Sequence, residues 1–264
     1  MNRITELFQK VKRENRKVLI PFITAGYPDL ESTPKLLSAL FEGGADLIEI
    51  GIPFSDPIAD GPIIQASSQI ALQNGVTVKW IFKTIKSLRK TIPVPLIFFT
   101  YLNPILRYGL EKFFKDAESI GVDGVLIPDL PPEESKEIKN IANANNVKTI
   151  FLISPNSSNE RMRLIEKLSD DFIYCVSVTG TTGTRDKLYS DIKPYLMRLK
   201  SNLKKPYVVG FGISTVEDVS KISEFSNGVV VGSALIKFIE KLKNDKNFYE
   251  KVSNYLRKLK RPLI

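Results

Sequence analysis

Eight short apolar segments recur along this chain, and stretches with helical spacing separate them. Most of the segments are apolar without alternation, which is typical of parallel strands that are buried on both faces. Strand–helix alternation repeated eight times over about 250 residues is the pattern of a closed (β/α)8 barrel. We therefore expect a single barrel domain over residues 1–264, with a doubly wound open sheet as the structural alternative. The predicted strands are residues 18–24, 45–50, 96–101, 124–127, 148–153, 172–178, 207–210 and 228–231.

Apolar residues at three- and four-residue spacing predict helices between these strands, and residues 78–88 carry one such stripe. Thr33 and Pro34 are the predicted N-cap and first residue of another helix, because a threonine side chain accepts from first-turn N–H groups and proline fits the first turn. Residues 2–14 are expected to form an extra helix before the first strand, and residues 246–260 a final helix after the eighth.

The chain contains no histidine. This excludes a Ser-His-Asp hydrolase, a histidine general base and a histidine-ligated metal site. Any acid–base chemistry must therefore come from Asp, Glu, Tyr, Lys or Cys.

The rest of the composition indicates a globular protein of a reducing compartment. The single cysteine, Cys175, cannot form an internal disulfide and lies in an apolar run, where a core thiol is expected. No apolar run approaches the ~18 residues of a membrane helix, and the N-terminus has no hydrophobic signal core. The net charge of +9 comes with lysines scattered over helical faces, which favours a solvated basic surface over a nucleic-acid site.

Two acids, Glu49 and Asp60, are the candidate catalytic groups of residues 48–61, Ile-Glu-Ile-Gly-Ile-Pro-Phe-Ser-Asp-Pro-Ile-Ala-Asp-Gly. Glu49 lies inside an apolar strand, where desolvation penalises the charged form and raises the pKa. Asp60 lies in the loop after that strand. Because barrel chemistry sits at the C-terminal ends of the strands and in the following loops, both acids are expected at one mouth. Carboxylates in such different surroundings can divide acid and base roles; the alternative is that Glu49 is a paired structural acid.

Glycines near the end of the chain predict a phosphate site. Gly210-Phe-Gly-Ile-Ser214 ends the seventh strand, and Gly232-Ser233 opens the helix after the eighth. Glycine lets the backbone approach a ligand closely, and a helix N-terminus offers unpaired N–H groups. Barrels frequently bind phosphate between these two loops; two ligand-free turns are the alternative. The Gly- and Thr-rich loop 177–185 is a candidate lid.

Aromatic residues at the ends of the first and third strands are candidates for an apolar pocket that would hold a flat substrate. They are Phe22, Phe99 and Tyr101, and core filling is the alternative for each one singly.

Together these segments resemble the alpha-subunit family of tryptophan synthase. Residues 48–61 match the family motif completely, and the glycine segments of the seventh and eighth strands follow in the correct order. Residues 21–28, 127–135 and 179–183 support the match, which covers essentially the whole chain. The resemblance implies a carbon–carbon lyase of tryptophan biosynthesis. Such a lyase cleaves indole-3-glycerol phosphate to indole and glyceraldehyde 3-phosphate by a retro-aldol route, without a cofactor of its own.

The resemblance also implies roles for individual residues. Glu49 would be the acid–base group that serves C3 of the indole ring and the substrate hydroxyl. Asp60 would take up the indole N–H and stabilise the charge that develops on the ring. Tyr174 would pack beside Glu49 and the lid. The implied substrate-binding residues are Phe22, Phe99, Tyr101, Leu126, Pro128, Tyr174, Thr182, Gly183, Gly212, Gly232 and Ser233.

A partner follows from the same resemblance. It is a beta subunit that carries pyridoxal phosphate and receives the indole through a tunnel, in an assembly of two alpha and two beta subunits. The cofactor would belong to that partner, so neither a cofactor nor a metal is expected in this chain. The implied location is the cytoplasm, or the stroma for a plastid-encoded protein. The implied docking surface consists of Ser55, Asp56, Pro57, Asn103 and Pro104.

Two other functions stay open from the residues alone. Another phosphate-binding barrel, such as a sugar-phosphate isomerase or epimerase, would share the glycine segments, although the lack of histidine counts against several of these enzymes. A barrel that only binds and regulates a beta subunit would bind substrate without turnover.

Overall fold

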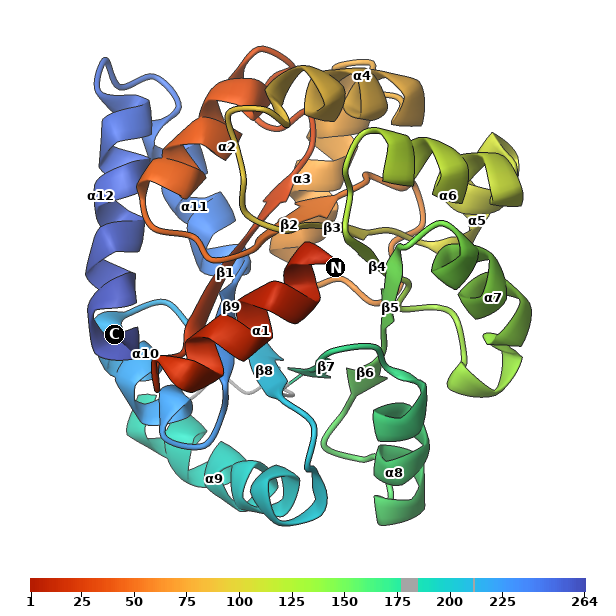
Figure 1. Ribbon diagram of the computed structural model, residues 1–264. Helices are drawn as coiled ribbons and strands as arrows, with labels where there is room; N and C mark the ends of the chain where they lie inside the picture. The colour runs from red at the N-terminus through yellow and green to blue at the C-terminus, as the bar shows by residue number, and fades with distance from the viewer. Residues whose placement is uncertain (177–184, 211) are drawn as a thin grey trace.

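The computed structural model describes residues 1–176, 185–210 and 212–264 of the 264-residue chain. Parallel strands form the centre of the molecule and helices surround them (Figure 1). In the described residues the strands follow the order β5-β4-β3-β2-β1-β9-β8-β7-β6. They are β1 (Val18–Thr24), β2 (Ile48–Gly51), β3 (Leu96–Phe99), β4 (Gly124–Leu126), β5 (Lys148–Ile150), β6 (Leu152–Ile153), β7 (Ile173–Val176), β8 (Tyr207–Gly210) and β9 (Gly228–Val231).

The barrel closes through its fifth predicted strand. β5 and β6 stand at the two ends of the strand order, yet Phe151 alone separates them in the sequence. β5 pairs with β4 and β6 pairs with β7, so the chain itself joins the two ends of the sheet. The predicted (β/α)8 barrel is therefore confirmed, and the open-sheet alternative is wrong.

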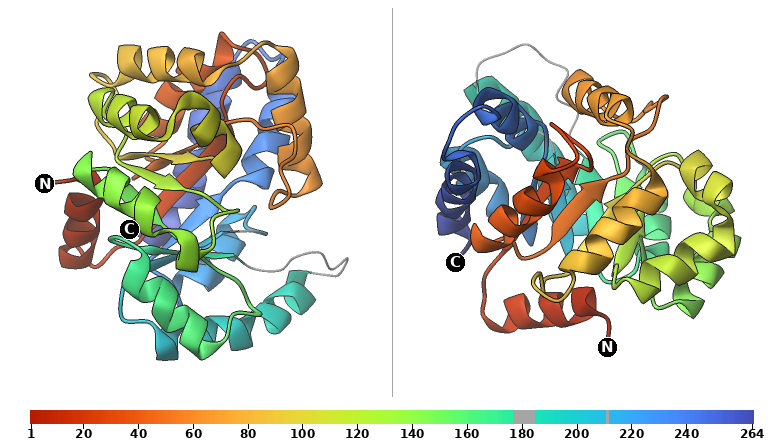
Figure 2. Two further views of the ribbon diagram at one scale, coloured as in Figure 1. Left: turned by 90° about the vertical axis from the view of Figure 1, so that its right-hand side faces the viewer. Right: turned by 90° about the horizontal axis from the view of Figure 1, so that it is seen from above.

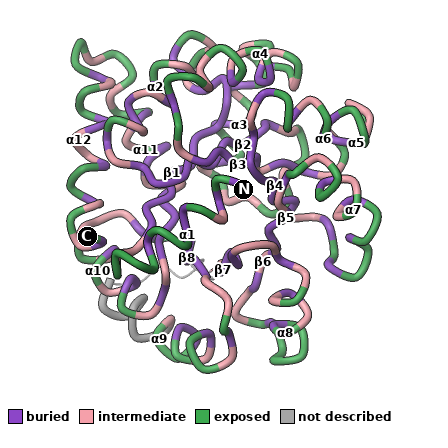
Figure 3. Tube along the Cα trace, viewed as in Figure 1, coloured by how far each residue is buried: buried purple, intermediate pink, exposed green. Residues whose placement is uncertain are grey.

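Helices cover the outside of the strands all the way round (Figure 1 and Figure 2). Buried residues follow the strands and exposed ones the outer helix faces (Figure 3). None of the helices in the described residues combines the length and apolar character needed to cross a membrane. The helices of this layer are α2 (Ser32–Glu42), α3 (Pro62–Gln73), α4 (Val78–Leu88), α5 (Leu102–Tyr108), α6 (Leu110–Ser119), α7 (Lys136–Ala144), α8 (Asn159–Leu168), α9 (Arg185–Asn202), α10 (Val216–Ser223), α11 (Ser233–Leu242) and α12 (Phe248–Lys260), with short 3-10 turns η1 (Pro132–Glu134) and η2 (Arg261–Leu263).

The start of α2 differs from the prediction. The helix begins at Ser32, and its N-cap residue, Glu31, makes no side-chain cap hydrogen bond. The Asp29 carboxylate accepts from the Ser32 N–H at 2.7 Å and so serves the first turn. Thr33 Oγ1 instead accepts from the Gly26 N–H at 2.8 Å. The threonine thus fixes the turn after β1 rather than the helix start.

The predicted N-terminal helix, α1 (Arg3–Arg13), covers the N-terminal end of the barrel (Figure 1). Its Arg3 guanidinium pairs at 2.8 Å with Asp123, the residue just before β4. Its Phe8 ring stacks on Phe172, just before β7, with centroids 5.0 Å apart. Burying this face removes apolar area from water and fills the floor of the barrel. The buried residues of α1 are Ile4, Leu7, Phe8 and Val11.

Phe8→Ala is expected to lower the free energy of unfolding by about 3–4 kcal/mol, because it removes a buried ring and leaves a cavity beneath the strands. Denaturant titration followed by circular dichroism measures the change. Lys12→Ala is the matched control, since Lys12 is an exposed residue of the same helix, and it should change stability by less than about 0.5 kcal/mol. Equal losses in the two variants would contradict the role given to the Phe8 ring.

Candidate active site

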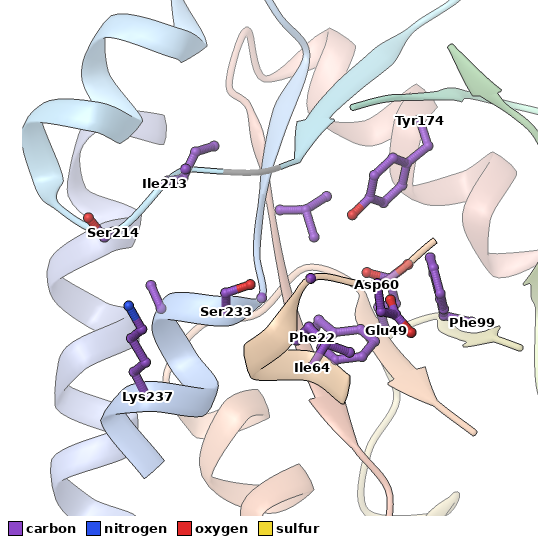
Figure 4. A pocket seen from close by; sticks show the side chains of 15 residues that line it. Phe22, Glu49, Asp60, Ile64, Phe99, Tyr174, Ile213, Ser214, Ser233 and Lys237 are labelled. Atoms are coloured by element: carbon purple, nitrogen blue, oxygen red, sulfur yellow. The ribbon is translucent and has the colours of Figure 1, made fainter. Parts of the chain in front are cut away.

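A cavity of about 260 Å³ opens at the C-terminal ends of the strands (Figure 4). Glu49 on β2 and Asp60 in the following loop lie at one end of it. The loop after β8 and the start of α11 form the other end. The lining residues are Phe22, Glu49, Asp60, Gly61, Ile64, Phe99, Tyr174, Gly212, Ile213, Ser214, Val230, Gly232, Ser233, Ala234 and Lys237.

Glu49 is a buried acid without a partner among the described residues. The strand register places it between Phe22 of β1 and Ile97 of β3, and it is 1% exposed. Neither of its carboxyl oxygens makes a hydrogen bond in the described part of the chain. Burial, and then the charge of Asp60, raises the pKa of Glu49 to about 8. The carboxyl therefore holds its proton at neutral pH. Leaving a buried polar group unpaired costs about 1–3 kcal/mol, which a ligand that pairs with it would recover.

Asp60 is held in place by a tyrosine. The Tyr101 hydroxyl donates to Asp60 Oδ2 at 3.0 Å and accepts from the Ala59 N–H at 3.0 Å. Burial raises the pKa of Asp60 to about 6, and the Tyr101 hydrogen bond opposes that rise. Asp60 is thus largely ionised at neutral pH while Glu49 is protonated. The two acids therefore differ in protonation state at neutral pH, as their different surroundings predicted.

Tyr174 of β7 adds a neutral hydroxyl to the same end of the cavity. Burial and the charges of Glu49 and Asp60 raise the pKa of Tyr174 well above its ordinary value. Its hydroxyl points into the cavity (Figure 4). The position depends on Gly210, because a Cβ there would lie 2.6 Å from the Tyr174 oxygen.

Two phenylalanines form an apolar wall beside the acids. The rings of Phe22 and Phe99 meet edge to face with centroids 5.9 Å apart. Gly51 makes room for this pair, since a Cβ there would lie 2.6 Å from the Phe22 ring. Ile64 of α3 also lines the cavity. The acid end can therefore accept a flat apolar group with a polar edge.

The opposite end has the features of an anion site. Gly212 has a φ of +73°, in the region that favours glycine, and Gly232 is the N-cap of α11. Gly232 supplies no side-chain cap, so the first-turn N–H groups of α11 are available to a ligand. Ser233 and Ala234 of that turn line the cavity. A helix N-terminus of this kind favours phosphate.

The model of the family described as Tryptophan synthase alpha chain matches residues 8–263. The chain belongs to this family. A tryptophan synthase alpha chain from Thermoanaerobacter sp. (strain X514) is 45% identical over 263 residues, covering 100% of both chains. Tryptophan synthase subunit alpha from Legionella pneumophila has a TM-score of 0.92 at 35% identity and covers 100% of this chain and 98% of its own. The tryptophan synthase complex from Pyrococcus furiosus gives a TM-score of 0.82 at 40% identity, with 92% and 98% coverage.

Membership of the tryptophan synthase alpha chain family establishes the reaction. This subunit cleaves indole-3-glycerol phosphate to indole and glyceraldehyde 3-phosphate, a lyase reaction of tryptophan biosynthesis. The activity implied by the sequence resemblance is thereby confirmed. A cavity with an apolar, acidic end and an anion-binding end suits a substrate that joins an indole ring to a phosphate.

Most of the predicted site residues of this alpha chain lie together on the cavity wall. Tyr101 lies behind the wall, where it holds Asp60. Leu126 is fully buried in the cluster that α1 covers, and Pro128 lines a separate cavity beside Arg161, so the positions of these two do not support their predicted contact with substrate. Thr182, Gly183 and the rest of the candidate lid up to residue 184 lie outside the described residues. The predicted residues that line the cavity are Phe22, Glu49, Asp60, Phe99, Tyr174, Gly212, Gly232 and Ser233.

Several lining residues were missed from the sequence. Lys237 lies four residues after Ser233 on the same face of α11, so helical spacing could have found it, and Ala234 directly follows Ser233 in the first turn. Ile64 is the third residue of α3, and nothing in its local pattern distinguishes it from a core residue. The missed residues are Gly61, Ile64, Ile213, Ser214, Val230, Ala234 and Lys237.

The predicted docking residues form a surface beside the Asp60 loop. Ser55, Asp56 and Asn103 are exposed, and Pro57 and Pro104 are half-buried. The rings of Phe54 and Tyr101, 5.3 Å apart, join the loop to the start of α5. Two exposed apolar side chains lie in the same two segments, Ile58 at 82% and Leu106 at 53% exposure.

Proposed function

We propose that Glu49 and Asp60 perform the retro-aldol cleavage of indole-3-glycerol phosphate in this cavity. The observation that carries the proposal is the pair itself: a protonated carboxyl, without a hydrogen-bond partner in the described part of the chain, beside an ionised carboxylate that Tyr101 orients. Such a pair can donate a proton at one point of a substrate and stabilise positive charge at another.

The proposed reaction begins at the indole ring. Glu49 donates its proton to C3, and Asp60 accepts a hydrogen bond from the ring N–H, which becomes more acidic as positive charge develops on the nitrogen. The Glu49 carboxylate then removes the proton from the hydroxyl on the side-chain carbon attached to C3. The bond between that carbon and C3 breaks, its electron pair restores the aromatic ring, and the carbon becomes the aldehyde of glyceraldehyde 3-phosphate. Glu49 ends with its proton restored.

The electrostatics of the cavity support this order. A pKa of about 8 keeps Glu49 protonated before the first step at neutral pH. A pKa of about 6 keeps Asp60 anionic throughout. The proposal needs no cofactor on this chain.

A beta subunit is the proposed partner, with pyridoxal phosphate on that subunit and two alpha and two beta chains in the assembly. The solved complex from Pyrococcus furiosus supports a partner, since its structure resembles that of this chain. The docking surface would be Ser55, Asp56 and Pro57 with Asn103 and Pro104. Because the same loop ends in Asp60, docking would order a catalytic residue directly, which couples partner binding to activity. The cytoplasm is the proposed location.

Indole release from indole-3-glycerol phosphate, measured with and without a beta subunit, tests both proposals. We expect slow release by the isolated chain and at least about tenfold faster release in the complex, the size of a typical coupling energy. Ile58→Asp, which changes the exposed apolar residue next to Pro57 of the docking surface, should remove the activation, whereas Met197→Asp, at an exposed apolar residue of α9, should keep it. Release in neither condition would contradict the lyase reaction of this chain and the proposed roles of Glu49 and Asp60, and equal rates in both would overturn the coupling alone.

A further inference from the structure

Lys237 is a cation at the end of the cavity opposite the two acids. It lies on α11, one turn after Ser233, and its side chain is exposed. Its ammonium lies on the side of Ser214 and Ser233, away from Glu49 and Asp60 (Figure 4). It is the only lysine or arginine among the described residues that line this cavity.

The carboxylates near this end of the cavity, Glu240 and Asp218, have partners other than Lys237. Glu240, the next acid along α11, pairs with Lys243 at 2.8 Å and accepts from the Tyr27 hydroxyl. Asp218, behind Ser214, accepts from the Ser214 N–H at 2.9 Å and completes the cap of α10. No ion pair or hydrogen bond of the Lys237 ammonium is found within the described parts of the chain, which leaves its charge for a ligand.

The charge balance of the cavity calls for such a cation. A phosphate monoester carries about −1.5 to −2 charges at pH 7. A helix N-terminus offers only about half a positive charge, and Asp60 at the far end is anionic. The backbone groups of Gly232 and Ser233 can therefore shape a phosphate site but do not balance the charge of its ligand.

We propose that Lys237 binds the substrate phosphate and sets the preference of this cavity for phosphorylated over unphosphorylated substrates. The inference rests on the proposed function, because it assigns a residue to the phosphate of the same substrate. Lys237 attracts the phosphate dianion of the substrate to the α11 end of the cavity. The indole ring of the same substrate then lies at the opposite end, beside Glu49 and Asp60. Its contribution is to binding, since the phosphate keeps its charge while the carbon–carbon bond breaks.

Steady-state kinetics of Lys237→Met, Lys237→Arg and the control Lys241→Met test this role. Lys241 lies one turn further along the same helix and does not line the cavity. We expect Lys237→Met to raise KM for indole-3-glycerol phosphate about tenfold with kcat within about twofold, as a lost contact to a charged group would. Lys237→Arg and Lys241→Met should stay within about threefold of wild-type KM, because the arginine keeps the charge.

Two competing ligands separate a phosphate contact from general damage. The inhibition constant of glycerol 3-phosphate should rise in Lys237→Met by the same factor as KM, while that of indole should not change. Added salt should raise KM more steeply for the wild type than for Lys237→Met. Unchanged KM and unchanged glycerol 3-phosphate inhibition in Lys237→Met would overturn the proposal, as would an equal loss in Lys241→Met or an equal weakening of indole.

Failure of the proposed function, the cleavage by Glu49 and Asp60 in this cavity, gives a different result. A wild-type chain that releases no indole would overturn it. Calorimetric titration with glycerol 3-phosphate would then still test Lys237: about tenfold weaker binding in Lys237→Met supports the anion contact, and equal binding by both chains overturns it.

Discussion

Glu49→Gln is expected to lower kcat for indole release by about a thousandfold, within the range that a general acid–base group contributes. Glutamine keeps the size of the side chain but can neither protonate C3 of the ring nor take the proton of the substrate hydroxyl. The protonated form of Glu49, which starts the reaction, predominates below pH 8 and is lost above it. Wild-type kcat/KM should therefore fall as the pH rises through about 8, and the residual activity of Glu49→Gln should lack this decline.

Asp46 provides a matched control for Glu49, as a buried acid just before the same strand. Its carboxylate pairs with Arg16 at 2.7 Å and accepts from the Leu19 N–H at 2.7 Å. Asp46→Asn should lower the free energy of unfolding by about 1–3 kcal/mol while the folded enzyme keeps its kcat. Glu49→Gln should instead lower kcat and leave the free energy of unfolding nearly unchanged, because Glu49 has no hydrogen-bond partner to lose among the described residues. Turnover by Glu49→Gln near the wild-type rate would refute the assigned mechanism.

Asp60→Asn is expected to lower kcat by about a hundredfold, the scale of removing one electrostatic stabiliser of a transition state. The amide can still accept a hydrogen bond from the ring N–H, but it brings no negative charge to balance the charge on the ring. Release of indole under saturating substrate measures the loss, and thermal unfolding confirms that the variant is folded.

Tyr101→Phe distinguishes the contribution that the position of Asp60 makes to the rate from the contribution of its charge. It removes the 3.0 Å hydrogen bond that opposes the raised pKa of Asp60 and leaves the carboxylate in place. We expect a loss of only about tenfold in kcat, the lower end of the effect of one hydrogen bond to a charged group. The decline in kcat/KM on the acid side, near pH 6, should also move to higher pH. The substrate phosphate titrates in the same range, but equally for both enzymes. A larger loss in Tyr101→Phe than in Asp60→Asn would contradict the role of the charge.

The barrel was predictable because its signal is repeated eight times. Each apolar run contributes a strand, so an error at one boundary does not change the count. The division of 148–153 into β5 and β6 was not predictable, since the residues on both sides of Phe151 are equally suited to a strand. The prediction that Thr33 caps α2 was wrong because its hydroxyl accepts from the Gly26 N–H instead. The sequence does not show this donor, since only the folded turn after β1 brings it near Thr33.

The acids of the candidate site were predictable, and the depth of the cavity was not. Glu49 stood out because a carboxylate in an apolar strand is costly to bury, and Asp60 stood out because it lies in the loop that follows the same strand. Leu126 pairs in register with Phe99, yet only Phe99 lines the cavity, because strand pairing does not tell how deep a side chain lies. Lys237 was hidden among many lysines on helical faces, and only its four-residue spacing from Ser233 on α11 could have distinguished it.

Helix α1, which closes the N-terminal end of the barrel, determines where substrate and products enter and leave. Because α1 fills the N-terminal end with apolar side chains, substrate and both products pass through the same mouth. The two products differ there, since indole is neutral and flat, whereas glyceraldehyde 3-phosphate is an anion that the proposed phosphate site would hold at the α11 end. A protein docked at the rim beside Asp60 would therefore meet the indole first, while the anion leaves on the other side. If a beta subunit docks there as proposed, a barrel closed at its N-terminal end would let that partner receive the indole before it reaches solution.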